Sequence, residues 1–316
     1  MSISIGYFGS PAHSAQLLSL LLDAGIKVDF VVTNPDRPVG RKKELTPTPV
    51  KTIAIRHSIP VIQSERLRSD EVATEQIRSY PSSIHVVYAY GSIIPEAVFQ
   101  FPEYGSINLH GSLLPKYRGA SPVQSFLLSG ETVSGFTIQH LAKEVDSGDI
   151  VIQESWDVGS AETTEDLLNA ITEKGAAPLI HLIRNLESEP LPKTPQNHSL
   201  ATHCRKIGSD DRVIDWTCSA FEIHNRIRAL YPDPLAYTVF REKRVIINRS
   251  VFIPDLKSDS AVPPGSFFIG EKKRLFCVCG DGNLLGIDTL QPEGKKPMSG
   301  FDFFNGARAV PGETFT

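Results

Sequence analysis

The residues with the clearest chemical potential lie in the stretch S-I-N-L-H-G-S-L-L-P-K-Y-R-G-A-S-P, residues 106–122. Asn108 and His110 are two positions apart at the end of a short apolar run, so on a strand their side chains leave the same face. Gly111 follows and lets another molecule approach the backbone closely. An amide donor beside an imidazole can stabilise an oxyanion or move a proton during acyl transfer. The same spacing also suits a pair that only pins the next loop.

A carboxylate partner for His110 is available in V-D-S-G-D at residues 145–149, a polar turn after the strand-like run 137–141. Asp146 or Asp149 could orient the imidazole and favour its protonated form. The alternative is a simple turn with a capping aspartate. The sequence has no nucleophile elbow, no H-E-x-x-H and no His/Cys cluster. It therefore predicts direct acyl transfer, with no metal and no covalent enzyme intermediate.

The elements that must position these residues alternate between strand and helix patterns. Strand-like runs are predicted at residues 3–8, 28–33, 84–89 and 106–109. Ser10 and Pro11 are expected to start a helix that continues to about Ala24. This alternation predicts an α/β fold with a doubly wound, Rossmann-like parallel sheet, which binds ligands at the carboxyl ends of its strands. The turn G-Y-F-G-S-P from Gly6 lacks the dinucleotide fingerprint G-x-G-x-x-G.

The pattern changes in the second half of the 316-residue chain. A long helix is predicted at residues 162–186. Residues 187–207, with three prolines, are expected to be a linker. A short helix and five strand-like runs then predict an OB-like β-barrel, with the runs at 235–240, 244–252, 265–269, 274–279 and 284–290. The expected domains are 1–186 for catalysis, 187–207 as linker and 208–316 as the C-terminal barrel.

Composition excludes several classes of protein. The net charge is −4, and residues 208–316 carry equal numbers of acidic and basic side chains, so any RNA binding must come from local patches. Its four cysteines form no C-x-x-C pair, which favours reduced cytoplasmic thiols. No apolar run approaches the length of a membrane span, and the first residues lack the signal-peptide pattern. We therefore expect a cytoplasmic protein that does not bind membranes.

The stretch N-L-H-G-S-L-L-P, with the downstream aspartate, resembles the site of the folate-dependent formyltransferases. Within that family, the chain is similar to the members that act on methionyl-tRNA. Glycinamide ribonucleotide formyltransferases lack a C-terminal domain and are a poorer match. The stretches that carry the narrower resemblance are 35–51, V-V-Y-A-Y-G-S-I-I-P at 86–95, V-I-D-W at 213–216, R-I-R-A-L-Y-P at 226–232, G-D-G-N-L-L at 280–285 and L-Q-P-E-G-K-K-P-M at 290–298.

This resemblance implies transfer of a formyl group from 10-formyltetrahydrofolate to the α-amine of methionyl initiator tRNA, which yields N-formylmethionyl-tRNA for translation initiation. It implies that Asn108 and His110 hold the oxyanion and that Asp146 orients His110. The implied folate-binding residues are Tyr88, Ala89, Tyr90, Gly91, Ser112, Leu113, Leu114, Pro115 and Gln139. The implied tRNA-binding residues are Arg37, Arg41, Lys42, Lys43, Lys206, Lys295 and Lys296.

The proline-rich loop 35–51, which also carries Lys51, resembles the loop that inserts into the tRNA acceptor stem. From its composition alone, this loop would be interpreted as a charged loop exposed to solvent. Two rival functions remain open. A nucleotide-sugar amine formyltransferase would share the site but should not need this loop or the C-terminal part. A non-catalytic tRNA-binding protein on the same scaffold would not need the intact trio Asn108, His110 and Asp146.

Overall fold

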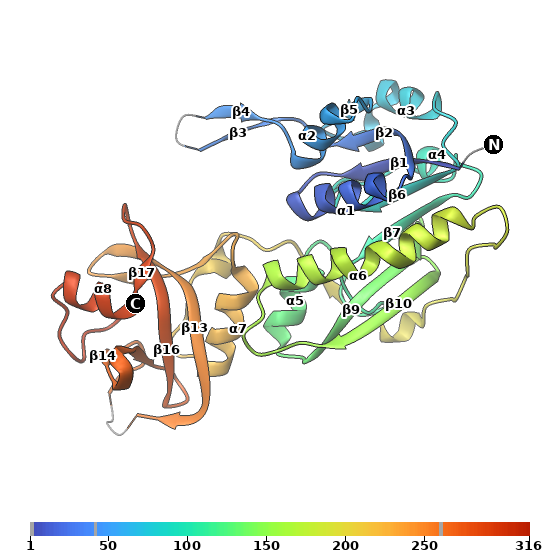
Figure 1. Cartoon of the computed structure of the whole chain (residues 1–316). Helices are drawn as coiled ribbons and strands as arrows, with labels where there is room; N and C mark the ends of the chain where they lie inside the picture. The colour runs from blue at the N-terminus through green and yellow to red at the C-terminus, as the bar shows by residue number, and fades with distance from the viewer. Residues whose placement is uncertain (1–2, 41–42, 259–261) are drawn as a thin grey trace. The chain divides into compact units, whose positions relative to one another are not determined.

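The computed structural model describes residues 3–40, 43–258 and 262–316, which form two compact units (Figure 1). Unit 1 comprises Met1–Pro122, Ser134–Trp156 and Leu168–Cys204. Unit 2 comprises Val123–Val133, Asp157–Leu167 and Arg205–Thr316. Unit 2 thus takes two short segments from the first half of the chain.

Unit 1 is built on a seven-stranded sheet with the order β10-β9-β7-β6-β1-β2-β5. The strands are β1 (Ser4–Gly9), β2 (Lys27–Thr33), β5 (Val61–Gln63), β6 (Ile84–Tyr88), β7 (Ser106–His110), β9 (Val133–His140) and β10 (Ile150–Asp157). The ladder from β5 through β2, β1 and β6 to β7 is parallel, and β9 runs antiparallel to β7. The predicted Rossmann-like sheet is confirmed.

The helices that lie against this sheet are α1 (Ala12–Asp23), α2 (Pro49–Arg56), η1 (Leu67–Ser69), α3 (Glu71–Arg78), α4 (Glu96–Phe99) and α6 (Thr164–Arg184). They belong to unit 1, apart from the first four residues of α6, which belong to unit 2. Helix α6 packs closely on β7 because residue 175 is glycine: a Cβ there would lie 2.9 Å from Leu109 Cδ1. Phe8, Phe30 and Val87 belong to a core cluster that includes residues of α3 and α4. Apolar residues therefore hold β6 and β7 in place.

The start of α1 differs from the prediction. The helix begins at Ala12, Pro11 occupies the cap position, and no side chain caps it. The Ser10 hydroxyl instead accepts hydrogen bonds from the Asn34 backbone N–H at 3.1 Å and from the Thr33 hydroxyl at 3.2 Å. Ser10 therefore ties the carboxyl ends of β1 and β2 together, and proline alone starts the helix.

Unit 2 contains the antiparallel sheet expected from the five strand-like runs, and its path is β12-β13-β16-β15-β14, with β17 paired to β16. The strands are β12 (Ala236–Phe240), β13 (Lys243–Lys257), β14 (Phe267–Ile269), β15 (Leu275–Val278), β16 (Asn283–Pro292) and β17 (Met298–Ser299). The helical elements of this unit are α5 (Pro122–Ser129), η3 (Asp210–Arg212), α7 (Ala220–Leu230), η4 (Glu271–Lys273) and α8 (Gly300–Gly306). Helix α8 had no counterpart in the sequence-based prediction.

The last residues close this sheet into a barrel. Val239 of β12 and Thr316 exchange backbone hydrogen bonds of 2.8 and 2.9 Å. On the other side, the Phe267 N–H of β14 donates to Glu313 O at 3.0 Å. Phe315 stacks on Phe267 in the barrel core, with ring centroids 4.4 Å apart. The predicted OB-like barrel is thus confirmed, and the last residues, which form an isolated bridge with Ser266 rather than a strand, join its two edges.

Residues 187–204, expected to be part of a linker, pack within unit 1. Thr194 pairs with Ile150 through two backbone hydrogen bonds of 2.8 and 3.0 Å. Strand β11 (His203–Cys204) pairs with β8 (Arg118–Gly119), and η2 (His198–Leu200) lies between these contacts in sequence. The three prolines remove backbone donors but do not prevent packing. The domain limits 186 and 207 stay a prediction.

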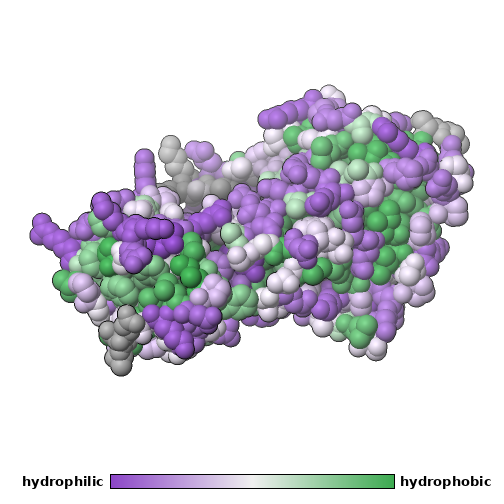
Figure 2. Space-filling view, turned by 60° about the horizontal axis from the view of Figure 1, so that its bottom comes forward, coloured by the Kyte–Doolittle hydropathy of each residue, from purple (hydrophilic) through white to green (hydrophobic). Residues whose placement is uncertain are grey.

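A two-stranded hairpin of β3 (Arg37–Val39) and β4 (Glu44–Thr46) extends from the sheet of unit 1 (Figure 1). It belongs to the proline-rich loop singled out in the sequence. Within the described ranges, no helix is both long and apolar enough to cross a membrane. Hydrophilic residues cover much of the face shown in Figure 2, with hydrophobic residues between them.

His85 in β6 makes the stability of unit 1 dependent on pH. It is 1% exposed, and neither ring nitrogen has a hydrogen-bond partner among the residues that the structure describes. Burial lowers the pKa of His85 to about 3. Between that pH and the ordinary histidine pKa of about 6.5, the unfolded chain binds a proton that the folded chain does not, so stability falls as the pH falls.

We therefore expect His85→Leu to flatten the acid side of the stability curve. From pH 7 to pH 5, wild type should lose about 2 kcal/mol through this residue, and the variant should not. An apolar replacement leaves no buried ring nitrogen unpaired. Denaturant unfolding at the two pH values measures the difference. Parallel losses in wild type and variant would contradict the assignment to His85.

Candidate active site

Strand β7 carries Asn108 and His110 to the carboxyl end of the parallel ladder, between β6 and β9. The antiparallel register sets Asn108 opposite Gln139 and His110 opposite Thr137. Because strand side chains alternate, these four side chains share one face. His110 and Gln139 are buried, whereas Asn108 is half-buried, so the site is partly open to solvent.

Asp146 reaches this face from the turn after β9. Its Oδ1 lies 3.5 Å from His110 Nδ1, 3.5 Å from Asn108 Nδ2 and 2.8 Å from Gln139 Nε2. The Gly119 backbone N–H donates to Oδ2 at 2.8 Å. Asp146 has a φ of 53°, a left-handed conformation that a surrounding network has to maintain. Asn108, Gln139 and Gly119 donate N–H groups to this carboxylate, and His110 Nδ1 donates to it when that nitrogen carries a proton.

Asp149, the other candidate carboxylate, lies differently. Its backbone carbonyl accepts a hydrogen bond of 2.9 Å from the His140 N–H. The geometry therefore pairs His110 with Asp146. His110 Nε2 lies 3.1 Å from the Tyr117 carbonyl oxygen. Both ring nitrogens thus face acceptors, and each donates when it carries a proton.

The tyrosines predicted to bind folate place their rings in the core of unit 1. Tyr88 is 3% exposed, and its hydroxyl lies 3.0 Å from the Thr172 hydroxyl of α6. Tyr90 is 2% exposed and packs edge-on against Phe8. Burial raises the pKa of Tyr88, and it raises the pKa of Tyr90 to about 12. Ala89, between the two tyrosines, and Gly91, after Tyr90, are exposed, with φ of 52° and 82° respectively. This turn therefore presents backbone rather than aromatic rings.

The loop 112–115 is tied to β9. Leu114 N–H donates to the Thr137 hydroxyl oxygen at 3.1 Å, and that hydroxyl donates to Ser112 O at 2.7 Å. The Ser112 hydroxyl donates to Lys116 O at 2.7 Å. Leu113 and Pro115 are half-buried. Gln139, which was predicted to bind folate, lies in the cluster around Asp146.

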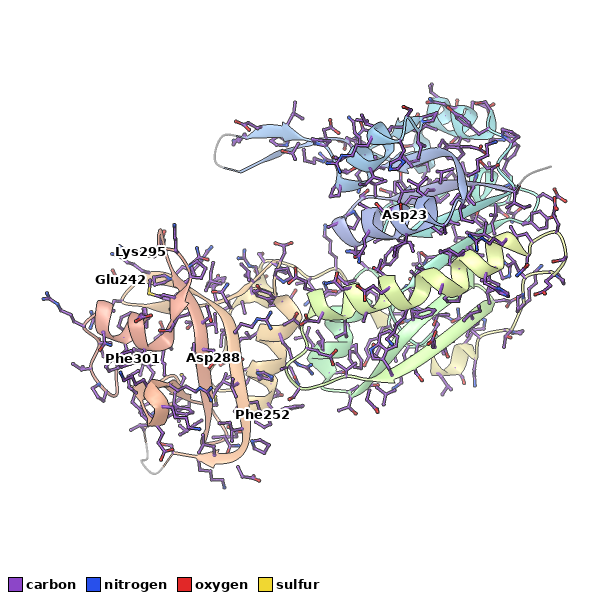
Figure 3. All side chains as sticks on the ribbon, viewed as in Figure 1. Asp23, Glu242, Phe252, Asp288, Lys295 and Phe301 are labelled. Atoms are coloured by element: carbon purple, nitrogen blue, oxygen red, sulfur yellow. The ribbon has the colours of Figure 1, made fainter. Side chains whose placement is uncertain are left out.

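The cations predicted to bind tRNA lie on exposed elements, where the structure describes them. Arg37 in β3 makes an ion pair of 3.2 Å with Glu65. Lys43 follows the hairpin tip, Lys206 follows β11, and Lys295 and Lys296 occupy the turn between β16 and β17, where Figure 3 labels Lys295. Arg41 and Lys42 lie outside the described residues.

Lys51 differs from the other loop cations because it is tied to its neighbours. Its Nζ donates to both Asp36 oxygens at 2.8 and 2.9 Å and to Gln63 Oε1 at 2.8 Å. Gln63 Nε2 in turn donates to Asp36 Oδ1 and Asn34 O, both at 2.8 Å. The cluster Asp36, Lys51 and Gln63 therefore joins the two ends of the loop to the end of β5.

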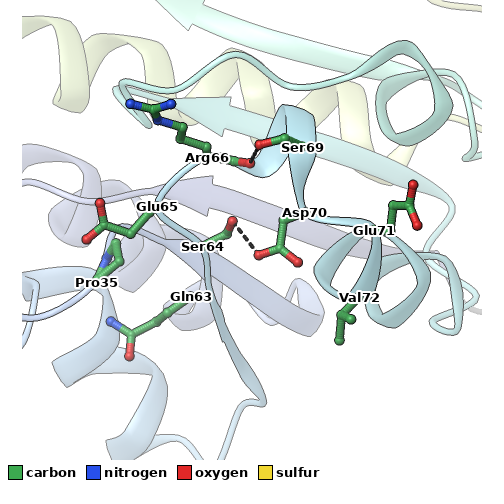
Figure 4. A pocket seen from close by; sticks show the side chains of 9 residues that line it. All are labelled: Pro35, Gln63, Ser64, Glu65, Arg66, Ser69, Asp70, Glu71 and Val72. Carbon is green, nitrogen blue, oxygen red and sulfur yellow. Dashed lines mark hydrogen bonds between the residues drawn. The ribbon is translucent and has the colours of Figure 1, made fainter.

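A pocket of about 650 Å³ lies beyond the carboxyl end of β5 (Figure 4). It is lined by Pro35, Gln63, Ser64, Glu65, Arg66, Ser69, Asp70, Glu71 and Val72. Asp70 points toward it but is already used: it accepts from the Ser64 hydroxyl at 2.7 Å and from the Ala73 N–H at the start of α3. The Asn108–His110–Asp146 cluster is not part of this pocket, and we place the chemistry at the cluster because its side chains converge there.

Two polar residues of the site were given no role in the sequence analysis, although Arg118 lies in the stretch 106–122 singled out there. Arg118 and Gln196 are each 5% exposed and bond to each other next to Asp146. Gln196 lies in the proline-rich stretch, 50 positions from Asp146, and no local period marks it. Within the described ranges, no group of three or more histidine, cysteine or carboxylate side chains could hold a metal ion.

Comparison with known proteins matches both parts of the chain. The formyl transferase family model covers residues 3–183, and the model of the formyl transferase C-terminal domain covers residues 206–308. A methionyl-tRNA formyltransferase from Leptospira interrogans is 46% identical over 316 residues, which is 99% of this chain and 100% of that protein. The chain belongs to the methionyl-tRNA formyltransferase family.

Other members of the methionyl-tRNA formyltransferase family match with similar coverage. The protein from Halalkalibacterium halodurans is 38% identical, over 96% of this chain and 95% of its own length. A solved N-formyltransferase from Helicobacter canadensis, in complex with folinic acid and dTDP-3-aminofucose, is 20% identical with a TM-score of 0.67. It covers 92% of this chain and 99% of its own, and this likeness supports the fold alone.

Proposed function

We propose that this enzyme transfers the formyl group of 10-formyltetrahydrofolate to the α-amine of methionine on initiator tRNA. The observation that carries the proposal is the convergence of Asn108, His110 and Asp146 at the end of β7 in a chain 46% identical, over its length, to a methionyl-tRNA formyltransferase. The product would be N-formylmethionyl-tRNA for translation initiation, and we place the reaction in the cytoplasm.

The turn after β6 fits a folate donor through its exposed backbone. The nearest atom that a Cβ at Gly91 would meet is Asn34 Nδ2, at 3.9 Å, so a flat ring can approach this glycine. Asn34 Nδ2 also donates to Tyr90 O at 3.2 Å and holds the turn. The donor supplies a formyl group bound to nitrogen. We assign Ala89, Gly91 and the 112–115 loop to holding it.

The cluster can carry out direct acyl transfer. The α-amine of methionine attacks the formyl carbon, a new C–N bond replaces the bond to the folate nitrogen, and the proton lost by the amine ends on that nitrogen. The formyl oxygen gains negative charge on the way. Asn108 Nδ2–H can donate to it, and so can His110 Nε2–H once it leaves the Tyr117 carbonyl oxygen, because His110 Nδ1 faces Asp146. Asp146 accepts from His110 and keeps the ring oriented.

The tRNA partner requires cations that face outward. We assign this role to Arg37 and Lys43 at the hairpin β3–β4 and to Lys206, Lys295 and Lys296, which are exposed. Arg41 and Lys42 lie outside the described residues, and we assign them to tRNA only because the loop 35–51 resembles the one that inserts into the acceptor stem. Phosphate contacts from such side chains position RNA without needing a basic protein as a whole. The net charge of −4 is compatible with that arrangement.

Replacing Lys51 with methionine should reduce the use of tRNA without affecting the donor. The change removes the bonds that join the two ends of the hairpin loop to β5. A displaced hairpin should lower kcat/KM for charged initiator tRNA about 10-fold, since a small misplacement of a binding element has effects of this order. Steady-state kinetics with each substrate varied in turn measures it.

The matched control is Lys27→Met, which removes the lysine paired with Asp29 at the start of β2. This variant should retain wild-type kinetics. An equal loss with tRNA and with donor in Lys51→Met would assign the cluster to the catalytic unit as a whole and not to the hairpin.

One assay separates the proposed function from its rivals. Purified protein is given 10-formyltetrahydrofolate with either charged initiator tRNA or a nucleotide-linked sugar amine. Transfer to methionyl-tRNA alone supports the proposal. Transfer to the sugar amine alone would replace it with the nucleotide-sugar reaction. Binding of tRNA without any transfer would indicate a non-catalytic protein.

A further inference from the structure

A buried hydrogen-bonded chain leads from Arg118 to the carboxylate of Asp146. Arg118 Nε and Nη2 donate to Gln196 Oε1 at 3.1 and 2.6 Å. Arg118 Nη2 also lies 3.0 Å from His198 Nδ1. Because Arg118 and Gln196 are each only 5% exposed, water does not compete freely for these bonds.

Gln196 also forms hydrogen bonds with the turn that carries Asp146. Its Nε2 donates to the carbonyl oxygens of Gly148 at 2.7 Å and Asp146 at 3.0 Å, and it lies 3.3 Å from Gln139 Oε1. Gln139 Nε2 then donates to Asp146 Oδ1 at 2.8 Å. Gln196 therefore contacts both the backbone of the turn and the side chain that bonds the carboxylate.

The chemistry of these groups allows one direction of donation along the chain. A guanidinium can only donate, so Gln196 must turn its oxygen toward Arg118. Its amide nitrogen then faces two carbonyls, which can only accept. Gln139 must in turn present its oxygen to Gln196, which leaves its nitrogen for Asp146. The orientation of each amide is thus dictated by its partners, although oxygen and nitrogen have nearly the same shape.

We infer that Arg118 and Gln196 are positioning residues for formyl transfer, which hold the Asp146 side chain as a fixed acceptor beside Asn108 and His110. This inference rests on the proposed function. Neither residue touches the reacting atoms. They act through Gln139 and through the left-handed turn at Asp146, whose carbonyl Gln196 holds.

The decisive variant is Gln196→Glu, which keeps the size of the side chain and can still bond Arg118. A carboxylate cannot donate to the turn carbonyls or to Gln139, so Gln139 is expected to turn its oxygen toward Asp146. We expect kcat to fall about 10- to 100-fold while KM for the formyl donor changes less than about 3-fold, because the catalytic groups are misplaced and the donor turn is not.

A double-mutant cycle separates positioning from a structural role. If Gln196 acts through Asp146, Gln196→Glu should lower kcat less than about 3-fold further in an Asp146→Asn background. Arg118→Lys, which keeps a side chain that only donates, should retain most of the turnover. Arg118→Gln, which can present either an oxygen or a nitrogen, should lose about as much as Gln196→Glu. The matched control is Gln76→Glu on the exposed side of α3, which should behave as wild type.

The outcomes distinguish this inference from the proposed function. Wild type without formyl transfer to charged tRNA would overturn the proposed function. Active wild type with full turnover in Gln196→Glu would overturn the positioning role alone. Equal, independent losses in the cycle would also overturn it, since they would show that Gln196 only stabilises the fold. If Gln196→Glu does not fold, the contrast between Arg118→Lys and Arg118→Gln decides: equal turnover in the two variants would reject the inference.

Discussion

Asp146→Asn should lower the rate of formyl transfer at least ~100-fold, since groups that handle protons at a reaction centre contribute effects of this order. The Asp146 carboxylate accepts from Gln139 and Gly119 and faces the His110 ring. An amide at this place must turn a nitrogen toward one of these donors, so His110 loses its orientation. Single-turnover transfer with saturating tRNA measures the chemical step, and donor binding should stay near wild type.

Asp149→Asn is the matched control for this prediction. Asp149 supplies its backbone carbonyl to His140, and the substitution leaves that carbonyl in place. Its single-turnover rate should stay within a few-fold of wild type. The opposite pattern, with Asp149→Asn inactive and Asp146→Asn active, would remove Asp146 from the mechanism.

Asn108→Ala should lower kcat/KM by two to three decades, because one lost oxyanion donor costs roughly 3–4 kcal/mol in acyl-transfer enzymes. Asn108 Nδ2 is the amide donor on the face of β7 that also carries His110. The loss should appear in kcat, because the developing oxyanion exists only in the transition state. Steady-state kinetics with charged initiator tRNA measures both constants.

The informative control for this prediction is donor affinity in the same variant. If Asn108→Ala raises only the KM of the donor and leaves kcat intact, Asn108 binds the ground state and is not an oxyanion donor. His110 would then remain the candidate donor in this cluster.

The sequence predicted the parts of the site that depend on local geometry. Asn108 and His110 share a face because strand side chains alternate, and that follows from their spacing alone. The choice between Asp146 and Asp149 did not follow, since it depends on how the turn after β9 folds back. Gln139 shows the same limit. Its contact with the cluster comes from the β7–β9 register, which no local pattern in either strand specifies.

Tyr88, at the end of β6, and Tyr90, just after it, show a second limit. Residues 84–88 are buried throughout, so the run lacks the alternation that tells one face from the other. Tyr88 turned out to bond α6, and Tyr90 packs against Phe8 on the side of another core cluster. The sequence also placed Lys51 among the loop cations, but Asp36 and Gln63 hold it. Contacts between distant segments decide such cases.

The packing of residues 187–204 within unit 1 bears on how members of this family could be recombined. A chimera that crosses over after residue 186 would take Gln196 from one parent and Arg118 and Asp146 from the other. A crossover between Cys204 and Arg205 keeps these three with their own parent. Even that junction divides a unit, because Val123–Val133 and Asp157–Leu167 pack with the barrel: the Thr164 hydroxyl donates to Ala229 O at 2.7 Å. We therefore expect active hybrids when Val123–Val133 and Asp157–Leu167 come from the same parent as the barrel.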